Sequence, residues 1–238
     1  MNIAIIGYGK MGHAVESVGT AQGHLFPLIV DVDNREDLNE ERLRQVDVAI
    51  EFSTPQTAPG NILACLDHHV PVVSGTTGWN ERFGEIEQYC RKKKGTLFHA
   101  SNFSIGVNIL FALNEQLARI MDRFPQYAPA IREVHHIHKL DAPSGTAITL
   151  ARQVIKEHSR IHSWHGGNEA QEGSLPIESV REGEVKGYHS IRYDSEVDIL
   201  SLSHEAKSRN AFVAGALLAA AFIQGKKGIF GMKDLLKL

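Results

Sequence analysis

The stretch MNIAIIGYGKMGHAV at residues 1–15 decides the fold of the first half of the chain. Residues 3–6 form a short, wholly apolar run, as expected of a strand buried on both faces of a parallel sheet. Gly7, Gly9 and Gly12 follow as G-x-G-x-x-G, and apolar residues then recur at helical spacing through residue 21. A strand, a glycine turn and a helix in this order predict a dinucleotide-binding unit, whose glycines let the backbone approach a pyrophosphate at the helix N-terminus. The alternative is a glycine turn that binds nothing.

Outward from this unit, strand-like and helix-like runs alternate through residue 100. Strands are predicted at 25–30, 46–52, 70–74 and 96–100, with helices near 57–67 and 81–93 between them. Such alternation is typical of a doubly wound parallel sheet of the Rossmann type.

After Asn102 the pattern changes. Helices are predicted at 106–124 and 144–158, strands at 130–137, 188–193 and 196–204, and a loop with short extended pieces at 166–187. Strands collected without helices between them indicate a second, α+β domain with an open mixed or antiparallel sheet. A helix at 211–224 and a short closing element at 231–238 end the chain.

Composition excludes several classes of protein. A net charge of −3 over 238 residues argues against bulk nucleic-acid binding. Cys65 and Cys90 lie in predicted helices and lack metal-ligand spacing, which favours a reducing compartment without disulfides. No apolar run is long enough to span a membrane, and the N-terminus lacks the features of a signal peptide. We expect a cytoplasmic protein without nucleic-acid or membrane partners.

Residues at the ends of three predicted strands suggest how a dinucleotide is held. Asp31 ends the second strand, 19 residues after Gly12, where a carboxylate would bind the adenosine ribose hydroxyls. The loops EFSTP at 51–55 and SGTTG at 74–78 also follow strands and would suit a nicotinamide ribose and its carboxamide. The alternative for each loop is ordinary turn chemistry.

The densest group of polar residues is EVHHIHKLDAPSGTA at 133–147. His135, His136 and His138 could supply imidazoles to a metal, but side chains alternate along a strand, so His135 should point away from the other two. Asp141 is the nearby carboxylate that could serve as a further metal ligand, but it lies three to six residues after the histidines. We therefore expect no metal site.

The same segment suits proton transfer and anion binding better. Lys139 and the imidazoles offer cations and a group that titrates near neutrality. A helix beginning after Ser144 would turn the amides of Gly145 and Thr146 outward toward a small dicarboxylate. The alternative is a solvated basic strand. On a straight strand His135 and Lys139 would lie roughly 13 Å apart, so we expect the chain to leave the strand between His136 and Lys139.

The run E-x-H-H-x-x-K-x-D-A-P-S-G-T-A resembles the signature of the 4-hydroxy-tetrahydrodipicolinate (dihydrodipicolinate) reductases. The motifs G-x-G-x-M-G, F-S-x-P and G-T-T-G, the run ASNFS at 100–104, and Ser208-Arg209 with Phe212 and Gly215 occur in the family's order. The resemblance therefore covers essentially the whole chain.

The resemblance implies an NAD(P)H-dependent oxidoreductase that forms tetrahydrodipicolinate in diaminopimelate and lysine biosynthesis. It gives His135 the role of proton donor or acceptor and Lys139 that of a second catalytic cation, with His136, Gly145 and Thr146 binding substrate. The implied dinucleotide contacts are Gly7, Tyr8, Gly9, Lys10, Met11, Gly12, Asp31, Gly75, Thr76, Thr77, Ala100, Ser101, Asn102 and Phe103.

The resemblance also implies an architecture and an assembly. A Rossmann domain of residues 1–103 with 211–238 would bind the dinucleotide, and residues 104–210 would bind substrate and form a homotetramer. The last two predicted strands also carry more apolar residues than a single buried face of the sheet would need, which predicts an oligomer. These residues are Ile191, Val197, Ile199, Leu200 and Leu202.

The sequence leaves open the choice of cofactor and two alternative functions. Val32, not the family's arginine, follows Asp31, so we expect NADH to be preferred, with NADPH as a second cofactor. The alternative functions are a two-domain nicotinamide dehydrogenase acting on an aspartate-derived semialdehyde, and a non-catalytic dinucleotide sensor.

Overall fold

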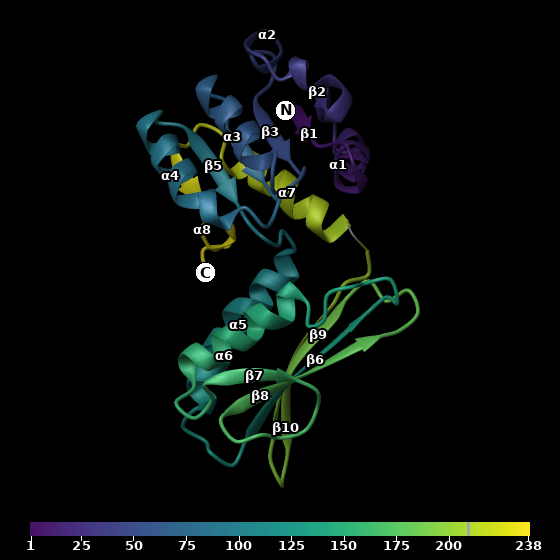
Figure 1. Cartoon of the computed structure of the whole chain (residues 1–238), viewed down its shortest axis with the longest axis vertical. Helices are drawn as coiled ribbons and strands as arrows, with labels where there is room; N and C mark the ends of the chain where they lie inside the picture. Colours follow the sequence, from purple (N-terminus) through teal and green to yellow (C-terminus); the bar gives the residue numbers. More distant parts are fainter. Residues whose placement is uncertain (209) are drawn as a thin grey trace. The chain divides into compact units, whose positions relative to one another are not determined.

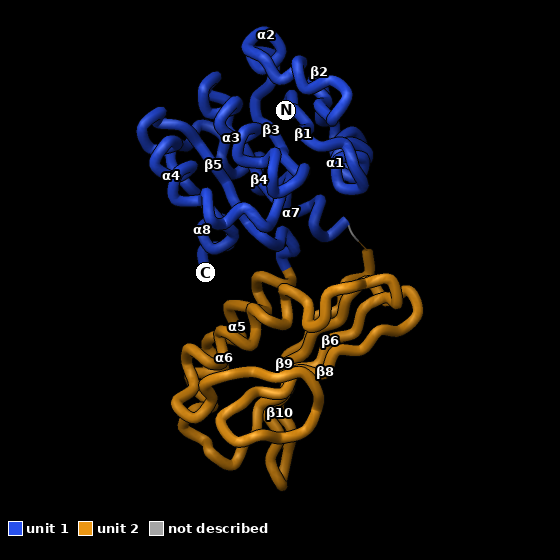
Figure 2. Tube along the Cα trace, viewed as in Figure 1, with its two compact units in different colours: residues 1–105, 210–238 blue, residues 106–209 orange. Residues whose placement is uncertain are grey.

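The computed structural model describes residues 1–208 and 210–238 and divides into two compact units. Unit 1 comprises residues 1–105 and 210–238, and unit 2 comprises residues 106–209 (Figure 2). The boundaries expected from the sequence, 103/104 and 210/211, differ from these by two residues and one residue. No helix in the described ranges is long and apolar enough to cross a membrane.

Unit 1 is built on a six-stranded parallel sheet of order β11-β5-β4-β3-β1-β2, which confirms the predicted doubly wound class. Its strands are β1 (Asn2–Ile6), β2 (Leu25–Val30), β3 (Val48–Glu51), β4 (Val72–Ser74), β5 (Thr96–His99) and β11 (Gly228–Phe230). Strand β11 was not predicted, because three residues that begin with glycine carry no recognisable alternation.

Helices cover both faces of this sheet (Figure 1). Because successive side chains of a strand point to opposite faces, Ala4 and Ile6 of β1 pack in one core with α3 and α4, and Ile3 and Ile5 pack in the other with α1 and α7. The helical segments are α1 (Lys10–Ala21), the 3-10 turns η1 (Val32–Asp37) and η2 (Asn80–Arg82), α2 (Glu40–Leu43), α3 (Ala58–Asp67), α4 (Phe83–Lys92), α7 (Asn210–Phe222) and α8 (Met232–Leu236).

Unit 2 has a mixed sheet of order β10-β9-β6-β8-β7. Its strands are β6 (Ala128–His135), β7 (Ser163–Gly166), β8 (Ser174–Arg181), β9 (Tyr188–Asp194) and β10 (Ile199–Glu205). The pairs β10–β9 and β9–β6 are antiparallel, and β6–β8 and β8–β7 are parallel. Helices α5 (Ile105–Met121) and α6 (Gly145–Glu157) share one core cluster with Ile131, Ile177 and Ile191 of the sheet. The predicted open mixed sheet is confirmed.

The predicted loop with short extended pieces at 166–187 was wrong at residues 174–181, which form a regular strand. Strand β8 occupies residues 174–181 and buries Leu175 and Ile177 completely. The glycines and charged residues on both sides of this strand outweighed its two inward apolar side chains in the interpretation of the sequence.

The apolar residues of β9 and β10 were expected to exceed what one covered face would use. In the structure they do not form a second apolar face. Ile191 is buried and Leu202 packs against the same helix-covered core. The opposite face carries charged pairs, Arg132 with Glu178 and Arg192 with Asp194. The exposed apolar side chains lie near the β9–β10 turn: Val197, Ile199 and Leu200.

Candidate functional site

The glycine turn of unit 1 is shaped for close backbone approach. Gly7 has φ +92°, and a Cβ there would lie 2.2 Å from the carbonyl oxygen of Phe52. A Cβ at Gly12 would lie 2.4 Å from the carbonyl oxygen of Gly7, so helix α1 fits against the turn only with glycine there. No heavy atom lies within 4 Å of the corresponding point at Gly9, which leaves the backbone open to a ligand.

The N-terminus of α1 fits a phosphate. Gly9 caps the helix without a side-chain hydrogen bond, and the first turn carries no acidic residue. The first amides of a helix point outward and attract anions. Of the other predicted contacts here, Lys10 is exposed, Met11 packs against the core, and the Tyr8 hydroxyl donates to Glu16.

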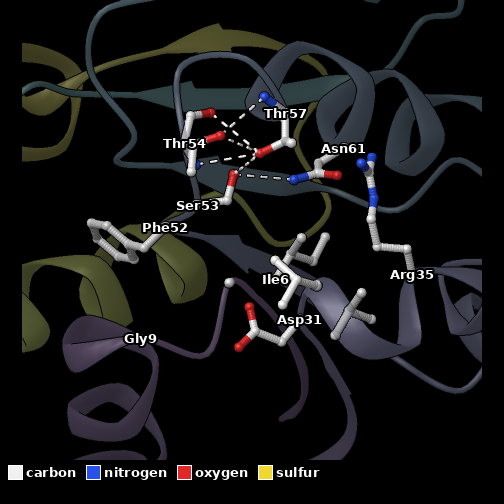
Figure 3. A pocket seen from close by; sticks show the side chains of 12 residues that line it. Ile6, Gly9, Asp31, Arg35, Phe52, Ser53, Thr54, Thr57 and Asn61 are labelled. Carbon is white, nitrogen blue, oxygen red and sulfur yellow. Dashed lines mark hydrogen bonds between the residues drawn. The ribbon is translucent and has the colours of Figure 1, made fainter.

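A pocket beside this turn contains Asp31, as expected (Figure 3). The Asp31 carboxylate lies on the Gly9 side, whereas the guanidinium of Arg35 extends toward Asn61 (Figure 3). Sequence reasoning missed Thr57 and Asn61, which reach the pocket from the start of α3. The pocket is lined by Ile6, Gly7, Gly9, Val30, Asp31, Val32, Arg35, Phe52, Ser53, Thr54, Thr57 and Asn61.

The two polar loops are tied together by a buried carboxylate. Glu51, at the end of β3, is completely buried and accepts from the Ser74 hydroxyl at 2.7 Å and the Thr76 hydroxyl at 2.9 Å. It also accepts from the Ser53 amide and hydroxyl. Three of the hydroxyls expected to meet a ligand therefore stabilise the loops themselves. The 51–55 loop lines the Asp31 pocket, whereas Gly75, Thr76 and Thr77 do not.

The segment 100–103 also divides its roles. Phe103 is only 2% exposed and packs against Phe52 and Phe98, so its side chain belongs to the core. The Asn102 side chain accepts from the Ser104 amide. Ala100 and Ser101 lie at or near the surface beside this turn.

In unit 2 the sheet register assembles a second polar group. Glu133 and His135 are two residues apart on β6 and therefore face the same side. Glu133 pairs with Ser179 of β8 and His189 of β9, and His135 pairs with Arg181. Five polar residues from three strands thus meet beside the N-terminus of α6.

The Glu133 carboxylate is fully buried and remains ionised. It accepts from the Ser144 amide at 3.0 Å and from Arg181 at 3.2 Å. Burial alone would raise its pKa, but His189, Ser144 and Ser179 lower the pKa well below its ordinary range.

The His135 imidazole is held in its neutral form. Burial, and then the Coulombic influence of His189, Lys139 and Arg181, lower its pKa to about 4, against the opposing influence of Glu133. The rings of His135 and His189 meet edge to face, with centroids 4.9 Å apart.

The chain leaves the strand before Lys139, as expected, but one residue earlier than the predicted exit between His136 and Lys139. Strand β6 ends at His135, and the Lys139 amide donates to the carbonyl of His136 across a turn. Lys139 Nζ binds both carboxylate oxygens of Asp141, at 2.7 and 2.9 Å, a partner not anticipated from the sequence. The rings of His136 and His138 lie 6.0 Å apart. Arg209, part of the family motif, lies outside the described residues.

Helix α6 begins with backbone amides that could bind an anion. The Ser144 side chain caps it by accepting from the Ala147 amide, and the Ser144 carbonyl accepts from Ile148. The first amides of a helix have no acceptor inside it. No acceptor within the described residues is found for the amides of Gly145 and Thr146, which could therefore bind a ligand. A separate pocket near Pro143, lined mainly from β7, β8 and the Gly166–Gly167 loop, contains none of the predicted substrate residues.

Glu133, His135 and His189 present ligand atoms within 4.8 Å of one another, a spacing that a metal ion could use. This group was not predicted from the sequence, which suggested His135, His136, His138 and Asp141 as the possible ligands, because His189 reaches Glu133 only through the pairing of β9 with β6. However, Arg181 already neutralises the carboxylate, and both carboxylate oxygens accept from the Ser144 amide. The donor set fits an internal ion pair better than a metal site.

Comparison with known proteins agrees with this arrangement. Residues 1–103 match the family model for the N-terminus of dihydrodipicolinate reductase, and residues 106–236 match the model for its C-terminus. A 4-hydroxy-tetrahydrodipicolinate reductase of Christiangramia forsetii is 44% identical over 99% of this chain and 98% of its own length. One from Alkaliphilus metalliredigens is 32% identical over 97% and 96%. A dipicolinate-bound dihydrodipicolinate reductase from Paenisporosarcina superposes with a TM-score of 0.75 at 26% identity, covering 97% of each chain. The chain therefore belongs to the dihydrodipicolinate reductase family.

Proposed function

We propose that this chain reduces 4-hydroxy-tetrahydrodipicolinate or dihydrodipicolinate to tetrahydrodipicolinate, in diaminopimelate and lysine biosynthesis. The observation that carries the proposal is the position of His135, a buried neutral imidazole next to the N-terminus of α6. The reaction needs a proton and a site for two carboxylates, and this strand end and helix start supply both.

A pyridine nucleotide supplies the hydride, and unit 1 would hold it. The open amides at Gly9 and the start of α1 would bind its pyrophosphate, and Asp31 its adenosine ribose. We propose NADH as the preferred cofactor, because Val32 offers no charge to a 2′-phosphate and Asp31 would repel it.

His135 would transfer the proton, assisted by Lys139. In the protein without substrate the imidazole is neutral, so it must acquire a proton before it can donate one. A dicarboxylate at the α6 N-terminus would raise the pKa of His135 through its negative charge. Lys139, held by Asp141, would then face the substrate as a second cation.

The substrate carboxylates would be bound by the amides of Gly145 and Thr146, with His136 nearby. Helix N-termini favour carboxylates through their free amides and their dipole. The solved Paenisporosarcina reductase has dipicolinate bound, and dipicolinate is a ring that carries two carboxylates. This supports the same ligand class here.

Oligomeric state and location are also proposals. The exposed apolar side chains at Val197, Ile199 and Leu200, on an edge strand and its turn, support pairing with another copy, and the resemblance favours a homotetramer. Light scattering that finds a monomer at micromolar concentration would contradict this. A cytoplasmic location remains a prediction from the sequence.

The test is NADH oxidation by the purified chain with substrate generated by a synthase in a coupled assay. We expect turnover with this substrate and none with an aspartate-derived semialdehyde. Turnover with the semialdehyde alone would favour the rival dehydrogenase. Nucleotide binding without turnover of either substrate would favour the sensor.

A further inference from the structure

Glu133 lies at the centre of the His135 group, although no role was predicted for it from its place in the sequence. One of its carboxylate oxygens lies 3.5 Å from Nδ1 of His135 and 3.6 Å from Nε2 of His189. All three residues are buried. A carboxylate facing an imidazole nitrogen favours the tautomer that carries a proton on that nitrogen.

The other nitrogen of the His135 ring, Nε2, lies beside a glycine. Gly187, with φ +147°, lies next to it, and a Cβ at this position would lie 3.3 Å from Nε2 of His135. The two ring nitrogens therefore have different surroundings: Nδ1 faces the carboxylate of Glu133, and Nε2 faces space left by a glycine. This arrangement leaves Nε2 as the atom that can exchange a proton.

The same carboxylate reaches the anion-binding site. Glu133 accepts from the Ser144 amide through both oxygens, at 3.0 and 3.1 Å, and Ser144 is the cap of α6. The Ser144 hydroxyl lies 3.0 Å from Nε2 of His189. Glu133 thus joins His135 to the first residues of α6.

Arg181 extends this network to the Lys139 turn. Its guanidinium pairs with Glu133 and also donates to the backbone carbonyls of Lys139 and Asp141. Arg181 thereby balances the charge of Glu133 and fixes the turn that carries Lys139. The His135 ring, the backbone of Lys139 and the cap residue of α6, Ser144, therefore all lie against the Glu133–Arg181 ion pair.

From these contacts, and on the proposed role of His135 in proton transfer, we propose that Glu133 is a positioning residue. It fixes His135 with a proton on Nδ1, so that Nε2 exchanges the catalytic proton, and it holds the N-terminus of α6 in register with that ring. Arg181 serves as its counter-charge.

A double-mutant cycle with Glu133→Gln and His135→Ala tests the proposal. Glutamine keeps the shape of the side chain but removes the charge that orients Nδ1. We expect Glu133→Gln to lower kcat by about tenfold or more, part of the roughly 10²–10⁴-fold that a positioned acid or base contributes. In the His135→Ala background the same change should alter kcat by less than about twofold, because interacting residues are not additive.

The matched control is Glu157→Gln. Glu157 lies at the other end of α6, is paired with Arg119 at 2.8 Å and has a side chain only 13% exposed. Its loss should leave kcat unchanged. An equal loss of kcat from Glu133→Gln in both backgrounds overturns the positioning role. Wild-type kcat in His135→Ala overturns the proposed proton donor instead, whatever Glu133→Gln does.

A measurement on the unmodified chain decides the matter even where Glu133→Gln does not fold. Nitrogen-15 NMR of labelled histidines reports which ring nitrogen carries the proton, and the His135 signals are assigned by their loss in His135→Ala. We expect the Nδ1–H tautomer at pH 7. A dominant Nε2–H tautomer overturns the proposal.

Discussion

Each unit buries one carboxylate at or near the carboxyl end of a central strand, and the two carboxylates have different neighbours. Among the described residues, the donors to Glu51 are a backbone amide and the hydroxyls of Ser53, Ser74 and Thr76. Glu133 faces a guanidinium and two imidazoles. Neutral donors tie loops together, whereas titratable neighbours make a carboxylate part of a proton-handling site. The neighbours, not the burial, determine the role.

The largest expected effect is a loss of kcat from substitutions in the His135 group of unit 2, with no effect on nucleotide binding by unit 1. We expect His135→Ala and Lys139→Ala each to lower kcat by roughly 10²–10⁴-fold, the usual contribution of acid–base groups. The Kd for NADH should stay unchanged, because that site is built by unit 1. Steady-state kinetics and fluorescence titration measure the two quantities. His165→Ala, which removes a β7 imidazole bonded to Ser174, is the control. Wild-type kcat in either variant would remove that residue from proton transfer.

Glu51→Gln should act on stability and on nucleotide binding rather than on the proton-transfer step. A glutamine amide replaces an acceptor with a donor, so at least one buried hydroxyl loses its partner, at a cost of about 1–3 kcal/mol in the free energy of unfolding. Urea denaturation measures this cost, and the KM for NADH should rise. The exposed Glu40→Gln, which removes a surface pair with Arg44, should change stability by less than about 0.5 kcal/mol. If Glu51→Gln instead lowered kcat strongly without changing stability, Glu51 would act like Glu133, and the proposed difference between the two carboxylates would be wrong.

Asp31 is an exposed carboxylate in unit 1, and its effect should be on cofactor choice alone. We expect kcat/KM to favour NADH over NADPH by about tenfold, or about 1.4 kcal/mol. Asp31→Ala should remove most of that preference. Because the Arg35 side chain lines the same pocket and a guanidinium binds phosphate well, Arg35→Ala should weaken use of NADPH more than use of NADH. A wild-type preference for NADPH would contradict the role given to Asp31 and point to Arg35.

The smallest effect is a pH dependence of binding. The pKa of His135 is about 4 in the free chain, below its ordinary value of 6.5, so the ring is neutral at pH 6–7. A bound dicarboxylate raises that pKa, so binding should take up at most about one proton and weaken as pH rises through the bound-state pKa. Calorimetry with dipicolinate in buffers of different ionisation enthalpy measures the uptake. His135→Ala should abolish it, and binding without proton uptake by the wild type would contradict the proposed charge coupling.

The first unit was predictable because its signals are local. The apolar run before Gly7, the glycine spacing and Asp31 lie within about thirty residues and obey helix and strand periodicity. The His135 group was predictable only in part. Glu133, Arg181 and His189 meet because strands far apart in sequence share a register, and β8, which carries Arg181, was interpreted as a loop. The hydroxyls of Ser53, Ser74 and Thr76 were assigned to a ligand because the sequence does not show that a buried Glu51 accepts from them.

The position of β11 and α7 has a consequence for biosynthesis. Strand β11, the sixth strand of the unit 1 sheet, and helix α7, which covers one face of that sheet, both come after the whole of unit 2 in the sequence. As the chain leaves the ribosome, unit 2 is complete while the β5 edge and the apolar side chains that α7 covers are still without their partners. Exposed edges and apolar faces of this kind invite aggregation. A released chain truncated after residue 209 would therefore contain the whole inserted unit but an unfinished nucleotide-binding unit, which would make it a target for chaperones.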